Sequence, residues 1–278
     1  MKRTIITIMG SLAAAALFIV TAGGSAGTDP GGVPAEIAVL QAQVAALQSQ
    51  VATLQANNAL ALGPYVTVDP NAENGVNGPN VILKGVNLHI ESGSGMTVDT
   101  TGLGNLVIGY DEDNNDPNTI NSRTGSHNLV VGPLHRFTAR GGLVAGVLNT
   151  VSGDGAFCVG NDNTASGLAS SVSGGQDNMA LGQEDSVSAG GGNTASGDRS
   201  SVSGGSNNTA SGFLSSISGG GNSTANATAS SVTGGNGNTA SATESTVSGG
   251  SGNTASGLYS SVGGGVGQTA SGIDQNIN

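Results

Sequence analysis

Three histidines carry the imidazole groups that this chain offers for catalysis or metal binding. His89, His127 and His135 stand apart, and none has the H-E-x-x-H spacing with which two histidines on a helix hold zinc. His127 and His135 flank residues 129–132 and can meet an acid across neighbouring turns, but scattered surface or turn histidines explain them more simply. We therefore predict that the protein is not an enzyme and has no catalytic residue and no cofactor.

An acidic cluster at residues 111–116 has part of the spacing of a calcium loop. Asp111, Asp113 and Asn115 alternate as the first oxygen ligands of such a loop do. Asp116 then stands where the loop needs glycine, and Ser122 stands where it needs a bidentate glutamate. The cluster is either a weak calcium site or, more simply, a solvated acidic loop.

Cys158 is the single cysteine of the chain, so it forms no internal disulfide. Counting back from the glycines that follow it, Cys158 is expected in one column with Ser173 and Ser188. A packed free thiol and an intermolecular bridge both remain open.

These residues belong to a chain that repeats every fifteen residues from Leu168 to Gly272, as S-S-V-S-G-G-x-x-N-T-A-S-G-x-x. A fixed period this short predicts a solenoid in which each turn, or rung, is buried only against its neighbours. One column holds a single aliphatic residue in every rung, and we predict it as the solenoid core: Val172, Val187, Val202, Ile217, Val232, Val247 and Val262.

The residue pattern of each rung predicts two short strands. In S-V-S and T-A-S the apolar residue lies between hydroxyl residues, and strand side chains alternate between faces, so valine and alanine point inward. The Gly-Gly pair and the asparagine before the second strand are expected to supply the positive φ values of the corners. With so narrow an interior, the fold class is all-β, a parallel β-roll or β-solenoid.

Degraded copies extend the roll to residues 105–278. The corner glycines run 109, 132, 146, 160 and 175, which gives rungs of fourteen or fifteen residues and one of twenty-three. The long rung holds an insertion of about nine residues between Asp111 and Arg123, expected on the surface. Residues 63–104 precede the roll as an irregular β segment.

The N-terminus changes character twice. Residues 1–26 read as a signal peptide, with Lys2-Arg3 before an apolar run and small residues near its end. We predict a secreted or cell-surface protein of a bacterium with no membrane span after cleavage, although a single-pass anchor is an alternative reading. Residues 27–34 form a linker.

Residues 35–62 carry a heptad seam typical of an oligomerising coiled coil. Isoleucine or valine occupies the a positions and leucine the d positions, at Ile37, Leu40, Val44, Leu47, Val51 and Leu54, before Asn58 enters an a position. The seam predicts a homo-oligomer and leaves the number of chains open. An amphipathic helix packed on its own domain is the alternative.

Charge excludes some partners. Once the signal peptide is removed, five basic residues remain against eighteen acids, a net charge near −13. Nucleic acid and anionic membranes are therefore poor partners.

Two variable columns follow the T-A-S-G corner of each rung. They contain apolar pairs at Phe213-Leu214 and Leu258-Tyr259. We predict that these four residues are exposed contacts, either for a ligand or for another subunit.

The V-x-G-G and N-T-A-S-G pattern resembles the head repeats of YadA-like trimeric autotransporter adhesins, and residues 106–109 and 125–132 resemble them most. The resemblance covers roughly residues 105–275. It implies a left-handed β-roll, three chains side by side and a head on a bacterial surface that binds host or matrix molecules. The chain departs from the family in its fifteen-residue rungs, in a heptad that precedes the roll, and in ending at Asn278 without the membrane barrel.

We therefore expect a non-enzymatic structural or adhesion module whose extracellular ligand the sequence does not name. One alternative is a passive surface spacer. Another is an ice-binding solenoid, because Thr-x-Ser pairs recur on successive rungs, at Thr194 with Ser196, Thr209 with Ser211 and Thr254 with Ser256.

Overall fold

A computed structural model describes residues 32–56, 62–112 and 122–278 of the chain, and within these residues the regular structure consists of short strands and one long helix. The chain divides into two units between Asn87 and Leu88. The predicted signal peptide, most of the linker, Asp113 and Asn115 lie outside the described residues.

The first unit contains helix α2 (Gly32–Gln55) and a hairpin of two antiparallel strands, β1 (Val66–Asp69) and β2 (Asn80–Leu83). The helix covers the predicted seam from Ile37 to Leu54, whereas Asn58 lies outside the described residues. By length and composition alone, Ala35–Gln55 is long and apolar enough to cross a membrane.

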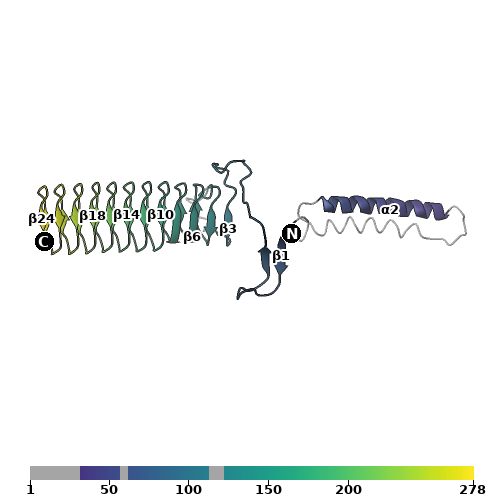
Figure 1. Cartoon of the computed structure of the whole chain (residues 1–278), viewed down its shortest axis with the longest axis horizontal. Helices are drawn as coiled ribbons and strands as arrows, with labels where there is room; N and C mark the ends of the chain where they lie inside the picture. Colours follow the sequence, from purple (N-terminus) through teal and green to yellow (C-terminus); the bar gives the residue numbers. More distant parts are fainter. Residues whose placement is uncertain (1–31, 57–61, 113–121) are drawn as a thin grey trace. The chain divides into compact units, whose positions relative to one another are not determined.

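The second unit is a parallel β-solenoid, so the predicted fold class is confirmed (Figure 1). Its larger sheet, the twelve-strand sheet, contains β3 (Leu106–Ile108), β4 (Leu129–Val131), β6 (Leu143–Val147), β8 (Phe157–Asn161), β10 (Ser171–Val172), β12 (Ser186–Val187), β14 (Ser201–Val202), β16 (Ser216–Ile217), β18 (Ser231–Val232), β20 (Thr246–Val247), β22 (Ser261–Val262) and β24 (Asn276–Ile277).

The smaller sheet, the ten-strand sheet, supplies the second strand of each rung. It contains β5 (Arg136–Phe137), β7 (Thr150–Val151), β9 (Thr164–Ala165), β11 (Met179–Ala180), β13 (Thr194–Ala195), β15 (Thr209–Ala210), β17 (Thr224–Ala225), β19 (Thr239–Ala240), β21 (Thr254–Ala255) and β23 (Thr269–Ala270). Strands pair in register, so Thr194 lies beside Thr209 and Val187 beside Val202. Each rung therefore repeats the side-chain positions of the one before it.

Four columns of side chains fill the interior of the roll. The valine column from Val172 to Val262 and the alanine column from Ala165 to Ala270 are at most 1% exposed. Two polar columns, which the sequence pattern did not identify as core, are buried as completely. They are the asparagine column (Asn149, Asn163, Asn178, Asn193, Asn208, Ser223, Asn238 and Asn253) and the serine column (Ser170, Asp185, Ser200, Ser215, Ser230, Ser245 and Ser260).

The prediction that the asparagine before the second strand forms the corner is wrong. The positive φ belongs to the preceding residue, such as Asp177 at 56° or Asn207 at 55°, and Asn178 and Asn208 are buried instead. The Gly-Gly pair does turn the chain, because Gly205, its second member, has a φ of 90°. The asparagine is needed inside because its amide group bonds to successive rungs.

The expected alignment of Cys158 with Ser173 is also wrong. Cys158 pairs with Val172 and lies in the core, completely buried. The error arises because the fourteen-residue rungs read V-A-G at residues 144–146, where later rungs read V-S-G-G at residues 172–175. The extra residue lies between the strand and the corner, so counting back from the glycines shifts the strand by one position.

Burial makes the Cys158 thiol unreactive. Desolvation raises its pKa to about 12, so little of the nucleophilic thiolate forms near neutral pH. We expect the native protein to react with a thiol reagent such as DTNB at less than about a hundredth of the rate of an exposed Ser188→Cys control, and to release one thiol per chain in urea. Rapid labelling of the native wild type would contradict this packing.

Candidate functional site

A small pocket at the start of the roll contains His127. It has a volume of about 180 Å³ and is lined by residues 91–93, 95–97 and His127. The backbone N–H of Ser92 donates to His127 Nε2 at 3.3 Å, and the buried Nδ1 has no hydrogen-bond partner. His89 is exposed on the same segment. The imidazole thus meets a backbone group rather than a nucleophile.

Asp99, which the sequence did not single out, organises the loop that forms this pocket. Its carboxylate accepts hydrogen bonds from the hydroxyls of Ser92 and Ser94 and, at 3.1 Å, from Thr101 Oγ1. The hydroxyl of Ser126, followed by those of Ser92 and Ser94, holds the pKa of Asp99 well below its usual range. So many donors keep the carboxylate ionised and occupied, which makes it a loop anchor rather than a general base.

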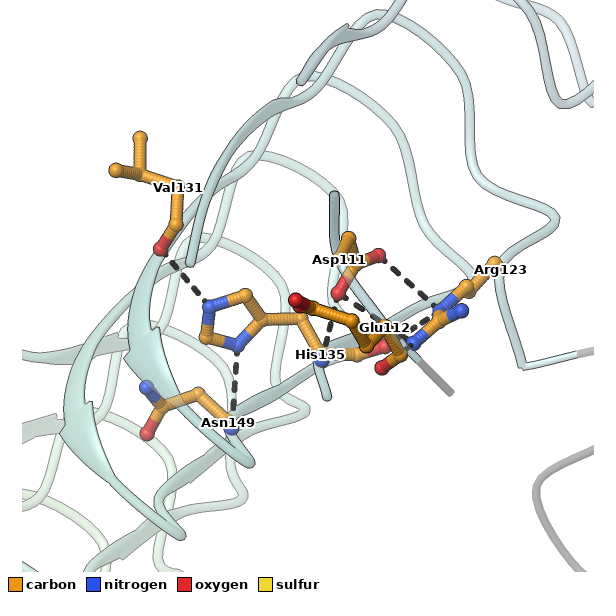
Figure 2. Close-up of polar contacts among 6 residues, drawn as sticks. All are labelled: Asp111, Glu112, Arg123, Val131, His135 and Asn149. Carbon is orange, nitrogen blue, oxygen red and sulfur yellow. Dashed lines mark hydrogen bonds and ion pairs between the residues drawn. The ribbon is translucent and has the colours of Figure 1, made fainter. Parts of the chain in front are cut away.

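Asp111 and Arg123, on either side of the insertion, contact each other and the roll (Figure 2). Asp111 Oδ2 lies 3.1 Å from Arg123 Nε, and Asp111 Oδ1 accepts a hydrogen bond from the backbone N–H of His135 at 2.9 Å. Arg123 also donates to the carbonyl of Glu112 at 3.0 Å. This arrangement counts against the calcium interpretation, because the buried carboxylate of Asp111 already has a cation and an N–H donor.

The ring of His135 begins the asparagine column. Its Nε2 lies 3.0 Å from the carbonyl of Val131, and its Nδ1 accepts from the backbone N–H of Asn149 at 3.3 Å (Figure 2). These partners assign the Nε2–H tautomer to a ring that is completely buried. The acid that His135 meets, Asp111, contacts its backbone and not its imidazole.

The asparagine column forms a continuous hydrogen-bond ladder along the roll. Asn193 is typical: its Nδ2 donates to the carbonyls of Ala189 at 3.1 Å and Gly205 at 3.0 Å, and its Oδ1 accepts from the N–H of Asn208 at 3.0 Å. Each amide thus bonds its own corner and the next rung. This satisfies backbone groups that the short strands leave unpaired.

Asp185 is the one carboxylate in the serine column. Its Oδ1 accepts from the N–H of Ser200 at 2.7 Å and its Oδ2 from the N–H of Gly182 at 2.6 Å. Burial nevertheless raises its pKa above the ordinary value, because loss of hydration outweighs these bonds. In other rungs a serine hydroxyl, such as that of Ser200 toward Gly197, accepts the equivalent N–H.

We expect Asp185→Ser to stabilise the roll at pH 7 by about 1–3 kcal/mol, the usual cost of a poorly solvated buried polar group. The folded state raises the pKa of Asp185, so the wild type gains protons on folding and becomes relatively more stable as the pH falls. The difference in urea midpoint between the two proteins should therefore shrink as the pH falls toward the ordinary pKa of the group, 3.8, and close below it.

The matched control for this experiment is Asp177→Asn, which neutralises an exposed carboxylate at a left-handed corner that asparagine tolerates. It should change neither the midpoint nor its pH dependence by more than a few tenths of a kcal/mol. A destabilised Asp185→Ser protein at pH 7 would contradict the argument.

Small hydroxyls dominate the outer faces of the later rungs. The threonine column from Thr194 to Thr269 runs in register on the ten-strand sheet, and serine fills most outward positions of the twelve-strand sheet. Met179 and Leu181 replace Thr and Ser in one rung of the ten-strand sheet and are 39% and 38% exposed.

The predicted contact residues lie at one corner of the roll. Phe213, Leu214, Leu258 and Tyr259 are 45%, 48%, 37% and 47% exposed. Leu214 and Tyr259 have φ values of 58° and 59°, which places their side chains on left-handed corners. The structure does not bring the two pairs together, because two rungs lie between them.

The heptad residues form a wholly exposed face on α2. Ile37, Leu40, Val44, Leu47, Val51 and Leu54 are 48–59% exposed, although each is apolar. Among the residues of α2 whose side chains are described, none is buried. The helix thus carries an apolar surface that the described residues of the first unit do not cover.

The residues that could perform chemistry therefore serve mainly to hold rungs and loops together, and the free surfaces are hydroxyl faces, corners and an apolar helix. Among the described residues, no group of three or more His, Cys, Asp or Glu side chains is placed to hold a metal ion. No protein-family model matches this chain, and no curated protein matches it either.

Proposed function

We propose that the protein is a secreted or cell-surface, non-enzymatic structural and adhesion module in which α2 joins copies of the chain and the β-roll presents a regular surface. The observation that supports this best is that the polar groups inside the roll form hydrogen bonds with one another and with the backbone. His135, Asp111 and the asparagine column are bonded to neighbouring rungs, which leaves them unavailable to a substrate.

The exposed seam of α2 supports self-association. Five of its flanking e and g positions carry uncharged glutamine, at Gln41, Gln43, Gln48, Gln50 and Gln55, and Glu36 is the one charged residue among them, so little charge repulsion opposes contact between identical parallel chains. Five glutamines also make this helix a poor membrane span. A homotrimer is the assembly that the resemblance to adhesin heads favours.

The surface supports an adhesive or spacer role outside the cell. The signal-peptide pattern of residues 1–26 directs the chain to secretion, and its acidity disfavours nucleic acid and anionic membranes. The exposed corner residues, including Phe213 and Tyr259, are the positions where a ligand would find side chains that differ from rung to rung.

Light scattering on residues 27–278 tests the proposal. We expect an oligomer over a range of concentrations, and a monomer when Leu40, Leu47 and Leu54 are all changed to serine. The matched control changes Ala38, Ala45 and Ala52 to serine, which lie off the seam in the same helical turns. A monomeric wild type, or an oligomer that ignores the seam variant, would overturn the proposed assembly.

Binding assays then separate adhesion from a passive spacer. The oligomer should bind an immobilised extracellular matrix preparation more tightly than the seam variant does, because several weak contacts act together in the oligomer. Equal and negligible binding by both proteins would favour the spacer.

The threonine column gives a specific reason to test ice binding as a second candidate. Thr194, Thr209, Thr224, Thr239, Thr254 and Thr269 face outward on strands that stack at about 4.8 Å. Thermal hysteresis that disappears in a Thr224→Lys, Thr239→Lys variant would support this candidate, and its absence in the wild type would remove it.

A further inference from the structure

An apolar patch covers the outer face of the twelve-strand sheet over its first four strands and no further. Two residues of each strand flank the inward-pointing one and therefore face outward. They are Leu106 and Ile108 on β3, Leu129 and Val131 on β4, Leu143 and Ala145 on β6, and Phe157 and Val159 on β8. We call these eight residues the base patch.

The base patch ends abruptly. Phe157 pairs with Ser171, and the same column continues as Ser186, Ser201, Ser216, Ser231, Thr246 and Ser261. The base patch remains accessible in the single chain, where Leu106, Ile108 and Phe157 are 41%, 52% and 37% exposed. Apolar side chains are thus contiguous on these four strands and are replaced by hydroxyls on the strands that follow, which makes the base patch the candidate contact surface of this sheet.

Charge differs between the two parts of the roll. Residues 105–160 contain three arginines and five acids, a net charge of −2, whereas residues 161–278 contain one arginine and seven acids, a net charge of −6. Charge repulsion between copies of the chain is therefore weaker over the rungs that carry the base patch than over the later rungs.

The size of the base patch shows that it cannot hold copies together unaided. Four strands at about 4.8 Å and three residues at about 3.3 Å give a face of roughly 19 by 10 Å, on the order of 200 Å² per copy. Stable interfaces bury about 800 Å² per partner. The seam of α2 would supply the missing affinity by raising the local concentration of the other base patches.

We propose that the base patch contacts the base patch of further copies of this chain, so that the rolls are joined over their first four rungs and remain separate from β10 to the C-terminal rung. The inference rests on the proposed assembly through α2. In an assembly with rotational symmetry, each copy offers the same patch to its neighbours, so the base patches of the copies meet. The hydroxyl faces of the later rungs then stay open to a ligand on all sides.

Cysteine cross-linking of residues 27–278 tests this arrangement in a Cys158→Val background, which matches the valine column. Leu143→Cys places a thiol in the base patch, and Ser216→Cys places one in the same column of a later rung. Under mild oxidation we expect at least tenfold more disulfide-linked chain from Leu143→Cys. Ala145→Cys serves as a second position if Leu143→Cys fails to fold.

The remaining outcomes separate this inference from the proposed function. If the protein is an oligomer and neither position cross-links, the base patches do not meet. If both positions cross-link equally, the rolls are packed along their whole length. Either result overturns the inference while the assembly stands. A monomeric chain overturns the assembly itself. Adding the seam changes at Leu40, Leu47 and Leu54 should reduce cross-linking of Leu143→Cys at least tenfold, because the base patch is too small to act alone.

Discussion

Gly205→Ala is expected to destabilise the roll by about 3 kcal/mol or more. Its φ of 90° lies outside the left-handed region that other residues tolerate, and a Cβ atom there would lie 2.1 Å from the carbonyl oxygen of Gly220. Both the backbone and the next rung would have to move. Urea unfolding followed by circular dichroism measures the loss.

Two other glycines provide controls for this prediction. A Cβ atom added at Gly204 would have no neighbouring atom closer than 4.0 Å, so Gly204→Ala should be nearly neutral. A Cβ atom at Gly212 would lie 2.0 Å from the carbonyl oxygen of Ala227, but Gly212 has no positive φ and its column already contains Ala227 and Ala242. Gly212→Ala should therefore cost less than Gly205→Ala, and equal losses would show that φ is not the deciding factor.

Asn193→Ala is expected to cost about 3–5 kcal/mol. The change removes three hydrogen bonds, leaves the buried N–H of Asn208 without this partner, and takes one donor from the carbonyls of Ala189 and Gly205. Each such group costs about 1–3 kcal/mol, and the cavity adds to the loss. Urea unfolding gives the total, and hydrogen exchange of the Asn208 amide reports the local opening. The half-buried neighbour Thr194→Ala is the control.

The serine in the asparagine column allows the reverse experiment. The hydroxyl of Ser223 accepts a hydrogen bond from the N–H of Asn238 in the next rung at 3.3 Å and donates to the carbonyl of Gly221 at 3.2 Å, whereas an asparagine amide can donate to two carbonyls. Ser223→Asn restores the group found in the flanking rungs at Asn208 and Asn238, and should add about 1 kcal/mol of stability. A neutral or destabilising result would show that this rung has adapted its backbone to serine.

The sequence by itself determined the solenoid. A single aliphatic residue at every fifteenth position and a glycine pair at the following corner leave few other ways to bury so little apolar surface, and Val172 and its equivalents are indeed the centre of the roll. The heptad of α2 was equally readable, because its period of three and four residues matches one face of a helix.

Only the tertiary structure decided which polar residues are interior. An asparagine before a strand favours a corner on local grounds, and nothing nearby in the sequence shows that Asn178 will find partners one rung away. The registration of Cys158 with Val172 and the joining of Asp111, Arg123 and His135 also depend on contacts between rungs. The base patch also depends on contacts between rungs. The alternation of Leu129 and Val131 is visible in the sequence, but only the stacking of four strands brings residues fourteen or twenty-three positions apart side by side. Stacking therefore turns isolated apolar residues into one surface.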